Sequence, residues 1–108
     1  MTLDDFKSII SVGDRFVLVD FFAVWCGPCK VMHPVMDAVE AQLGATLDVI
    51  RLDVDNYENH DVVSQFRINA VPTFILFYEG RQVWRKSGVM SESEFIEELR
   101  YQDRVAVY

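Results

Sequence analysis

Both cysteines of this chain, Cys26 and Cys29, lie within the segment VDFFAVWCGPCK at residues 19–30. Two thiols separated by two residues can close a small disulfide ring, and the second can release a partner bound to the first before it diffuses away. Pro28 suits the first turn of a helix, so we expect the pair at a helix N-terminus, where unpaired N–H groups favour a thiolate. The pattern indicates thiol–disulfide exchange, with Cys26 as the more acidic and more exposed sulfur and Cys29 as the more buried one.

A metal centre and a purely structural pair are the alternative interpretations of the two cysteines. Zinc and iron–sulfur sites usually need about four ligands, and only His33 and His60 are available beside Cys26 and Cys29. His33 follows Cys29 by four residues on the same predicted helix face, which keeps a three-ligand site open. A glycine-flanked helix start next to Trp25 is an unusual place for inert buried cysteines. Redox chemistry is therefore favoured, and no metal is expected.

A single carboxylate, Asp20, lies six residues before Cys26 in the apolar run VLVDFF. Burial disfavours a charged carboxyl, so we expect the pKa of Asp20 to be raised. An acid perturbed in this way beside a reactive centre is a candidate for proton transfer. The alternative is an aspartate at a strand end that faces water.

Hydrophobic periodicity predicts the elements that position these residues. The apolar run Phe16–Phe22 is typical of a strand buried on both faces, as in the centre of a parallel sheet. Thr73–Tyr78 and Gln82–Ser87 are separated by a short glycine-containing turn and should form an antiparallel hairpin. A βαβ unit followed by a hairpin and a closing helix predicts an α/β fold with a mixed sheet and helices on both faces. The other expected elements are helices at Leu3–Ile10, Cys29–Leu43 and Asn59–Phe66, a strand at Leu47–Val54, and a last helix capped by Ser91 that buries Phe95, Ile96 and Leu99.

The composition fits a single domain over residues 1–108. Hydrophobic residues make up 51% and charged residues 25%, which is enough apolar material for a packed core. The formal net charge of −7 argues against nucleic acid or an anionic membrane as the main partner. No stretch approaches the roughly 20 apolar residues that a membrane span needs, and MTLDDFKSII lacks the features of a signal peptide.

Several of these motifs together resemble the thioredoxin family. WCGPC follows a VDFF strand, Lys30 and Pro34 lie in the helix after it, and AVPTF at residues 70–74 and Gly88 come later. The resemblance covers about residues 4–99, nearly the whole chain. It implies a thioredoxin fold, which is a three-layer αβα sandwich around a mixed central sheet of four to five strands.

The resemblance also implies roles for individual residues. In thioredoxins the first cysteine of the motif attacks, the second resolves, and an aspartate behind the site helps to deprotonate the second, so Cys26, Cys29 and Asp20 take these catalytic roles. The family's proline in AVPTF is cis and faces the disulfide, which applies to the bond between Val71 and Pro72. A shallow apolar surface for extended or unfolded protein substrates is expected around the cysteines. Its expected members are Trp25, Gly27, Pro28, Val71, Pro72 and Gly88, with Ala70 and Val89 beside them.

The resemblance implies two kinds of partner, namely disulfide-containing substrate proteins and a thioredoxin reductase. That reductase is a flavoprotein that uses NADPH, so the chain itself should bind no cofactor beyond its own redox-active disulfide. The cytoplasm is the expected compartment, and the periplasm remains open. The alternative function is a thioredoxin-fold binding or chaperone-like module in which the cysteines are not catalytic.

The chain departs from the family pattern at three places. Arg51 stands where thioredoxins commonly carry a lysine near the aspartate. Because arginine stays protonated, a lysine-like proton relay is not expected. An arginine in a solvated position beside the strand is at least as well supported as such a relay. Only Met1–Leu3 precede the first helix, too few residues for the strand with which thioredoxins usually begin. The β-prone tail at 103–108 either pairs with an exposed sheet edge or frays. A monomer is expected, with a tail-mediated dimer as the alternative.

Overall fold

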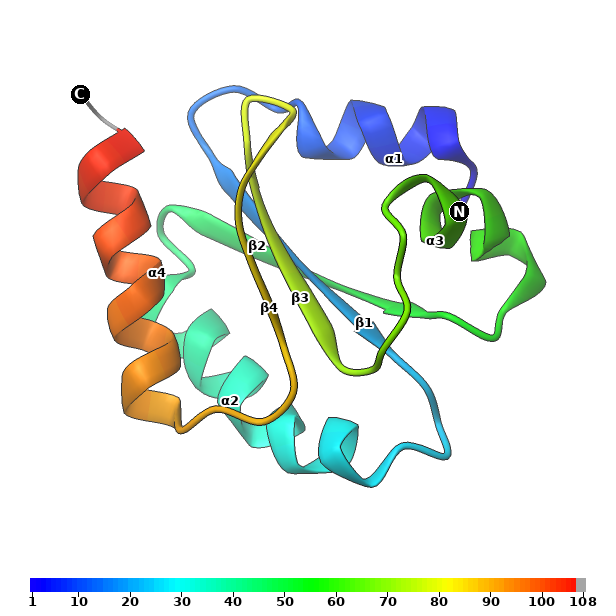
Figure 1. Cartoon of the computed structure of the whole chain (residues 1–108). Helices are drawn as coiled ribbons and strands as arrows, with labels where there is room; N and C mark the ends of the chain where they lie inside the picture. The colour runs from blue at the N-terminus through cyan, green and yellow to red at the C-terminus, as the bar shows by residue number, and fades with distance from the viewer. Residues whose placement is uncertain (107–108) are drawn as a thin grey trace.

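The computed structural model describes residues 1–106, which form four strands and four α-helices (Figure 1). For the elements whose two bounds were predicted, predicted and observed boundaries agree within two residues. The elements are α1 (Leu3–Ile10), β1 (Phe16–Phe22), α2 (Gly27–Leu43), β2 (Leu47–Asp53), a 3₁₀ turn η1 (Tyr57–Asn59), α3 (His60–Gln65), β3 (Thr73–Tyr78), β4 (Arg81–Ser87) and α4 (Glu92–Ala106).

The strands form one mixed sheet in the order β2-β1-β3-β4. The helix α2 connects β1 to the parallel strand β2, while β1–β3 and β3–β4 are antiparallel pairs. Figure 1 shows α2 and α4 on one face of the sheet and α1 and α3 on the other. The three-layer αβα arrangement predicted from the sequence is therefore confirmed.

The alternation of side chains along β1 determines which face of the sheet each side chain packs on. Phe16 and Leu18 pack in the core beneath α2 and α4, whereas Val17 and Val19 pack in the core beneath α1 and α3. Successive side chains of a strand point to opposite faces. Asp20 has the same parity as Leu18, so its carboxyl points to the α2 face.

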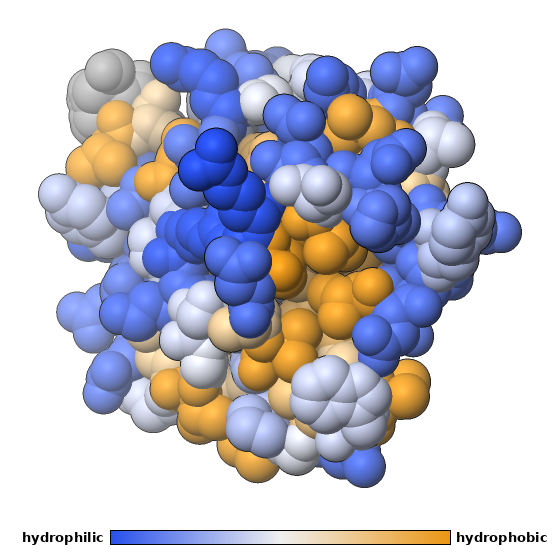
Figure 2. Space-filling view, turned by 45° about the vertical axis from the view of Figure 1, so that its right-hand side comes forward, coloured by the Kyte–Doolittle hydropathy of each residue, from blue (hydrophilic) through white to orange (hydrophobic). Residues whose placement is uncertain are grey.

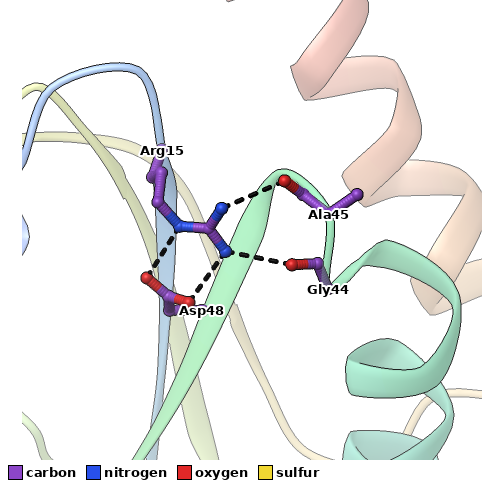
Figure 3. A network of polar contacts seen from close by, with 4 residues as sticks. All are labelled: Arg15, Gly44, Ala45 and Asp48. Carbon is purple, nitrogen blue, oxygen red and sulfur yellow. Dashed lines mark hydrogen bonds and ion pairs between the residues drawn. The ribbon is translucent and has the colours of Figure 1, made fainter.

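Arg15, just before β1, ties the start of β1 to the connection between α2 and β2 (Figure 3). Its guanidinium donates to both carboxylate oxygens of Asp48 at 3.0 and 2.8 Å, and to the carbonyls of Gly44 and Ala45 at 3.0 Å each. These carbonyls follow the last turn of α2, where intrahelical partners are missing. The contacts fix the far end of α2 relative to the start of β2.

Local sequence signals set the turn and caps that close the fold. The hydroxyls of Thr2 and Ser91 accept the backbone N–H of Asp5 and Glu94, which caps α1 and α4. The cap at Ser91 was predicted from the sequence. The β3–β4 turn has two residues with positive φ, 53° at Glu79 and 80° at Gly80. Such a turn matches the right-handed twist of a hairpin.

The structure corrects the expectation for the C-terminal tail. Residues 103–106 continue α4 and form neither a strand nor a frayed segment, and Ala106 packs against the core beneath α4. Residues 107–108 lie outside the described part of the chain. The four-stranded sheet agrees with the expectation that Met1–Leu3 add no strand, since α1 begins at Leu3. Over residues 1–106, no helix has both the length and the apolar character needed to cross a membrane.

Candidate active site

The cysteine pair lies at the N-terminus of α2, where the loop after β1 turns into the helix. Cys26 is the N-cap residue, and Pro28 occupies the first turn, where a missing N–H costs no helical hydrogen bond. The two cysteines are joined by a disulfide with their Cα atoms 5.3 Å apart. The backbone N–H of Cys29 donates to the Sγ of Cys26 at 3.1 Å. The helix therefore directs a backbone N–H that has no acceptor within the helix, and the positive end of its dipole, at this sulfur.

Both cysteines are buried in the disulfide form, with exposed fractions of 3% for Cys26 and 2% for Cys29. The expected contrast between an exposed and a buried sulfur is therefore wrong for the oxidised protein. The reason is that Ala23, Phe22 and Val71 pack around the pair. The carbonyl oxygen of Val71 lies 3.6 Å from the Sγ of Cys26.

The segment before β3 completes one side of the site. The Val71–Pro72 bond is cis, as the resemblance implied. The N–H of Gly88 donates to the carbonyl of Pro72 at 3.0 Å, and Gly88 has a positive φ of 88° that favours glycine. The hydroxyl of Thr73 donates to the carbonyl of Ala70 at 2.6 Å. These bonds hold the Val71 backbone against the disulfide.

Asp20 is only 1% exposed, and its Oδ1 has no hydrogen-bond partner. Desolvation raises the pKa of Asp20 from 3.8 to about 6, against the opposing effect of the Arg51 charge. The water-facing alternative is therefore wrong. Asp20 lies on the face of β1 that α2 covers, and Cys29 is one of the buried residues of α2. A buried carboxyl with a raised pKa thus lies on the same side of the sheet as the helix that carries Cys29.

Arg51 is the register partner of Asp20 on the neighbouring strand β2. Its guanidinium donates to Asp37 at 2.9 Å and to Glu40 at 2.8 Å, both on α2. Its side chain is 30% exposed, so the strand-side position considered from the sequence is a partly exposed one in which the guanidinium is ion-paired. The two ion pairs and the strand register give this arginine a fixed place, from which its charge lowers the pKa of Asp20.

An apolar surface lies next to the disulfide. Trp25 is 69% exposed, and its Nε1–H donates to Asp55 at 2.7 Å. Figure 2 brings forward the side that carries α3 and the β1–α2 loop and shows an apolar band bordered by hydrophilic side chains. A hollow of about 210 Å³ opens here. It is lined by Trp25, Val54, Ile68, Asn69, Ala70 and Val71.

The structure brings most of the residues predicted for this surface together around the cysteines. Gly27 and Pro28 are exposed in the first turn of α2, Val71 and Gly88 are half-buried, and Pro72 is buried. Sequence reasoning missed Val54, Ile68 and Asn69, which reach the hollow from other loops and carry no local signal. Within the described chain, no group of three or more His, Cys, Asp or Glu residues is placed to hold a metal ion.

Comparisons with known proteins agree with this geometry. A family model described as Thioredoxin matches residues 1–101. A thioredoxin of Mycolicibacterium smegmatis is 37% identical over 92% of this chain and 88% of its own length. The chloroplastic thioredoxin Y1 of Arabidopsis thaliana is 34% identical over 91% of this chain but only 56% of its own length. Among solved structures, a Malassezia sympodialis thioredoxin has a TM-score of 0.80 with 30% identity, covering 94% of this chain and 85% of that one.

The fold and the disulfide at the N-terminus of α2 define a thiol–disulfide oxidoreductase with the thioredoxin fold. Oxidised mitochondrial thioredoxin 3 from Saccharomyces cerevisiae has the same fold, with a TM-score of 0.79 at 28% identity over 92% of this chain and 89% of that one. The chain belongs to the thioredoxin family. Its activity is protein disulfide reduction by dithiol–disulfide exchange.

Proposed function

We propose that Cys26 is the attacking cysteine and Cys29 the resolving one. The observation that carries this assignment is the 3.1 Å contact from the Cys29 N–H to the Sγ of Cys26. This contact and the helix dipole stabilise negative charge on Cys26 once the disulfide is reduced. Cys29 lies inside the first turn, three residues after Cys26, where its sulfur can reach the Sγ of Cys26.

In the proposed reaction the Cys26 thiolate attacks one sulfur of a substrate disulfide. A mixed disulfide forms, and the other substrate sulfur leaves as a thiolate with the electron pair of the broken bond. The Cys29 thiolate then attacks the Sγ of Cys26. The Cys26–Cys29 bond forms, and the substrate leaves with both of its sulfurs reduced, so the protein has given up two electrons.

In this proposal Asp20 accepts the proton of the Cys29 thiol. Cys29 must lose its proton before it can attack, because the thiolate is the nucleophile. A carboxyl with a pKa of about 6 is mostly ionised at neutral pH and can accept that proton. Burial raises its basicity above that of an ordinary aspartate, which brings its proton affinity closer to that of a thiol.

We propose that substrates bind as extended segments across the apolar surface. The Val71 backbone faces Cys26 and can pair with an extended chain, as peptide strands do when they add to exposed backbone. The hollow beside Trp25 would take an apolar side chain next to the substrate disulfide. Gly27, Pro28, Pro72 and Gly88 form the rest of the contact surface, and the lack of side chains at both glycines allows close approach.

We further propose that the chain acts as a monomeric single domain in the cytoplasm, where reducing conditions keep such thiols reduced. Its electrons would come from NADPH through a thioredoxin reductase, so that the domain serves as an electron carrier without a bound cofactor. Disulfide-containing proteins would be its substrates. The family membership supports this sequence of partners.

Insulin reduction with dithiothreitol as the electron source tests the proposal. The wild type should be active, Cys26→Ser inactive, and Cys29→Ser should accumulate mixed disulfides at Cys26. Activity that survives Cys26→Ser would refute the attacking role. A wild type that suppresses aggregation of unfolded protein as well as the double serine variant does, but reduces no insulin, would favour the binding-module alternative.

A further inference from the structure

The charge of this acidic protein is distributed unevenly along the chain. The formal net charge is −7, yet residues 62–91 contain a single acidic residue, Glu79, against four basic ones. The four basic residues, all exposed, are Arg67, Arg81, Arg85 and Lys86. Within residues 1–106 the arginines that form ion pairs are Arg15 and Arg51, so these four have no carboxylate partner there. A positive surface therefore lies on a molecule that is negative overall.

Three of the four basic residues lie on β4, which is an edge strand. The order β2-β1-β3-β4 places β3 on one side of β4 and no strand of residues 1–106 on the other. The N–H of Gly88 donates to the carbonyl of Pro72 at 3.0 Å, and hydrogen-bonded pairs alternate with non-bonded pairs along antiparallel strands. The register then puts Ser87 and Arg85 in non-bonded pairs with β3. The backbone N–H and C=O groups of Ser87 and Arg85 therefore point outward from the sheet.

The basic side chains lie on both faces of this edge. Ile75, the register partner of Arg85, packs in the core beneath α1 and α3, so Arg85 lies on that face and Lys86 on the opposite one. The guanidinium of Arg85 donates to the carbonyls of Phe66 and Arg67 at 2.7 and 2.9 Å. These bonds bring Arg85 against the segment that carries Arg67 and leave its charge uncompensated. An extended segment along the outer edge of β4 would thus have cations on both sides.

The edge runs directly into the proposed substrate surface. β4 is followed by Gly88, which belongs to that surface, and the nearby carbonyl of Val71 lies 3.6 Å from the Sγ of Cys26. The bulge in the β3–β4 pair lies before Trp84, away from Gly88, so Trp84–Ser87 is the regular part of the edge. Figure 2 shows strongly hydrophilic side chains along one border of the apolar band. A segment on this edge would therefore be continuous with a substrate bound at the disulfide.

We propose that the outer edge of β4 binds an acidic extended segment of the substrate protein as a fifth strand, an inference that rests on the proposed function. The added strand pairs its backbone with the outward groups of Arg85 and Ser87. Its carboxylates interact with Lys86 and with the arginines beside the edge. The substrate disulfide then reaches Cys26 past Gly88. The preferred substrates are thus proteins that carry an acidic strand next to the disulfide.

Charge and backbone chemistry distinguish this occupant from others. A charged edge strand protects a sheet against pairing with its own copy, because two β4 edges would bring like charges together. Nucleic acid would meet the negative charge of the rest of the molecule, and it lacks the peptide groups that pair with a strand. Glu98 on α4 accepts the indole N–H of Trp84 at 3.0 Å, so its charge directs an acidic segment to the outer edge and away from α4.

Two peptides that contain the same intramolecular disulfide test the proposal. Three residues flank the disulfide on each side, glutamate in one peptide and glutamine in the other. The reduced protein is mixed with each peptide, samples are quenched with acid, and chromatography gives the second-order rate constant of reduction. Rates with dithiothreitol correct for the intrinsic reactivity of the two disulfides. Repulsion by the net charge of −7 alone would slow the glutamate peptide.

Docking on β4 predicts the opposite result. The glutamate peptide should be reduced about tenfold faster than the glutamine peptide at low ionic strength, and this advantage should largely disappear at about 1 M salt. A third peptide with N-methylated glutamates keeps the charges but lacks the N–H donors for strand pairing. It should lose most of the advantage.

Charge reversal locates the effect on the molecule. Lys86→Glu should bring the ratio of the glutamate and glutamine rates down to about one. Arg100→Glu is the matched control, because it changes the net charge equally. Arg100 is exposed and lines a hollow with Gln42 of α2, so this variant should keep most of the preference. Equal melting temperatures of the two variants and the wild type would show that the compared proteins are equally folded.

Equal rates for the glutamate and glutamine peptides in the wild type, or an equal fall of the ratio in both variants, would overturn the proposal. An advantage that survives N-methylation would overturn the strand pairing. Stronger competition by an RNA oligomer than by polyglutamate of equal charge would assign the edge to nucleic acid instead. A wild-type dimer in sedimentation that is absent in Lys86→Glu would assign it to a second copy. A failure of the proposed function differs from all of these, since the wild type would then reduce neither peptide.

Discussion

Replacing Asp20 by asparagine should stabilise the protein at neutral pH, even though it removes a group from the proposed site. Asp20 is buried, and its Oδ1 has no hydrogen-bond partner. The charged carboxyl is therefore poorly compensated, because the charge of Arg51 offsets only part of its desolvation. Asparagine has nearly the same shape and carries no charge, so the cost of burying the ionised form disappears.

The size of the effect follows from the pKa. A rise from 3.8 in the unfolded chain to about 6 in the folded protein corresponds to about 3 kcal/mol. Because the folded carboxyl holds its proton more tightly, the stability of the wild type falls as the pH rises through this window. The full cost is present above about pH 6 and absent below about pH 4. Asp20→Asn should therefore gain up to about 3 kcal/mol at high pH and almost nothing at low pH.

Urea unfolding of the oxidised wild type and variant across this pH range measures the difference. Asp48→Asn is the matched control with the opposite sign. The hydrogen bond from Arg15 lowers the pKa of Asp48, so that variant should lose stability at neutral pH, and the loss should fade as the pH falls. A gain for Asp20→Asn that does not change with pH, or no gain at about pH 8, would refute the assignment of a raised pKa to Asp20.

Substitutions at three further positions test other parts of the structure. Arg51→Gln should raise the pKa of Asp20 above its value in the wild type, since the arginine charge lowers it. NMR titration of the Asp20 carboxyl measures this pKa. Arg51→Lys keeps a positive charge and should change the pKa less. Trp25→Ala should raise KM for a protein disulfide about tenfold, as for an aromatic anchor, but leave the rate with dithiobis-nitrobenzoate nearly unchanged. Gly80→Ala should lower the free energy of unfolding by about 1–2 kcal/mol in urea, because φ is 80° and the added Cβ would lie 2.8 Å from the Ser11 hydroxyl; no loss would contradict the turn geometry.

Most of the fold could be predicted because its signals are local. The run Phe16–Phe22 and the hairpin around Gly80 show their structure in composition and turn chemistry, and both are observed. The tail could not be predicted in this way. Its alternating β-branched residues favour a strand, but residues 103–106 form the last turn of α4, where a growing helix supplies backbone partners and Ala106 gains packing against the core.

The chemical centre of the site was also visible in the sequence. The spacing of Cys26 and Cys29 and the apolar neighbours of Asp20 are features of adjacent residues, and they predict the helix position and the raised pKa that the structure contains. The exposure of Cys26 was not predictable from spacing, because it depends on Val71, which lies 45 residues further along the chain.

Contacts between distant segments account for what the sequence did not show. Asp55 accepts from Trp25 across 30 residues, and Arg51 reaches back to α2 across 14 and 11 residues. Neither partner is marked by a local pattern. The half-buried position of His33 likewise depends on packing against Phe22.

The thiolate at the start of α2 is the central claim, and the rate of alkylation of the reduced protein as a function of pH tests it most directly. Peptide mapping after brief treatment with iodoacetamide identifies which cysteine reacts first. The helix N-terminus and the Cys29 N–H predict that Cys26 reacts first, with a midpoint clearly below the 8.5 or so of an ordinary thiol. A Cys26 midpoint at or above that value, or earlier labelling of Cys29, would contradict the account.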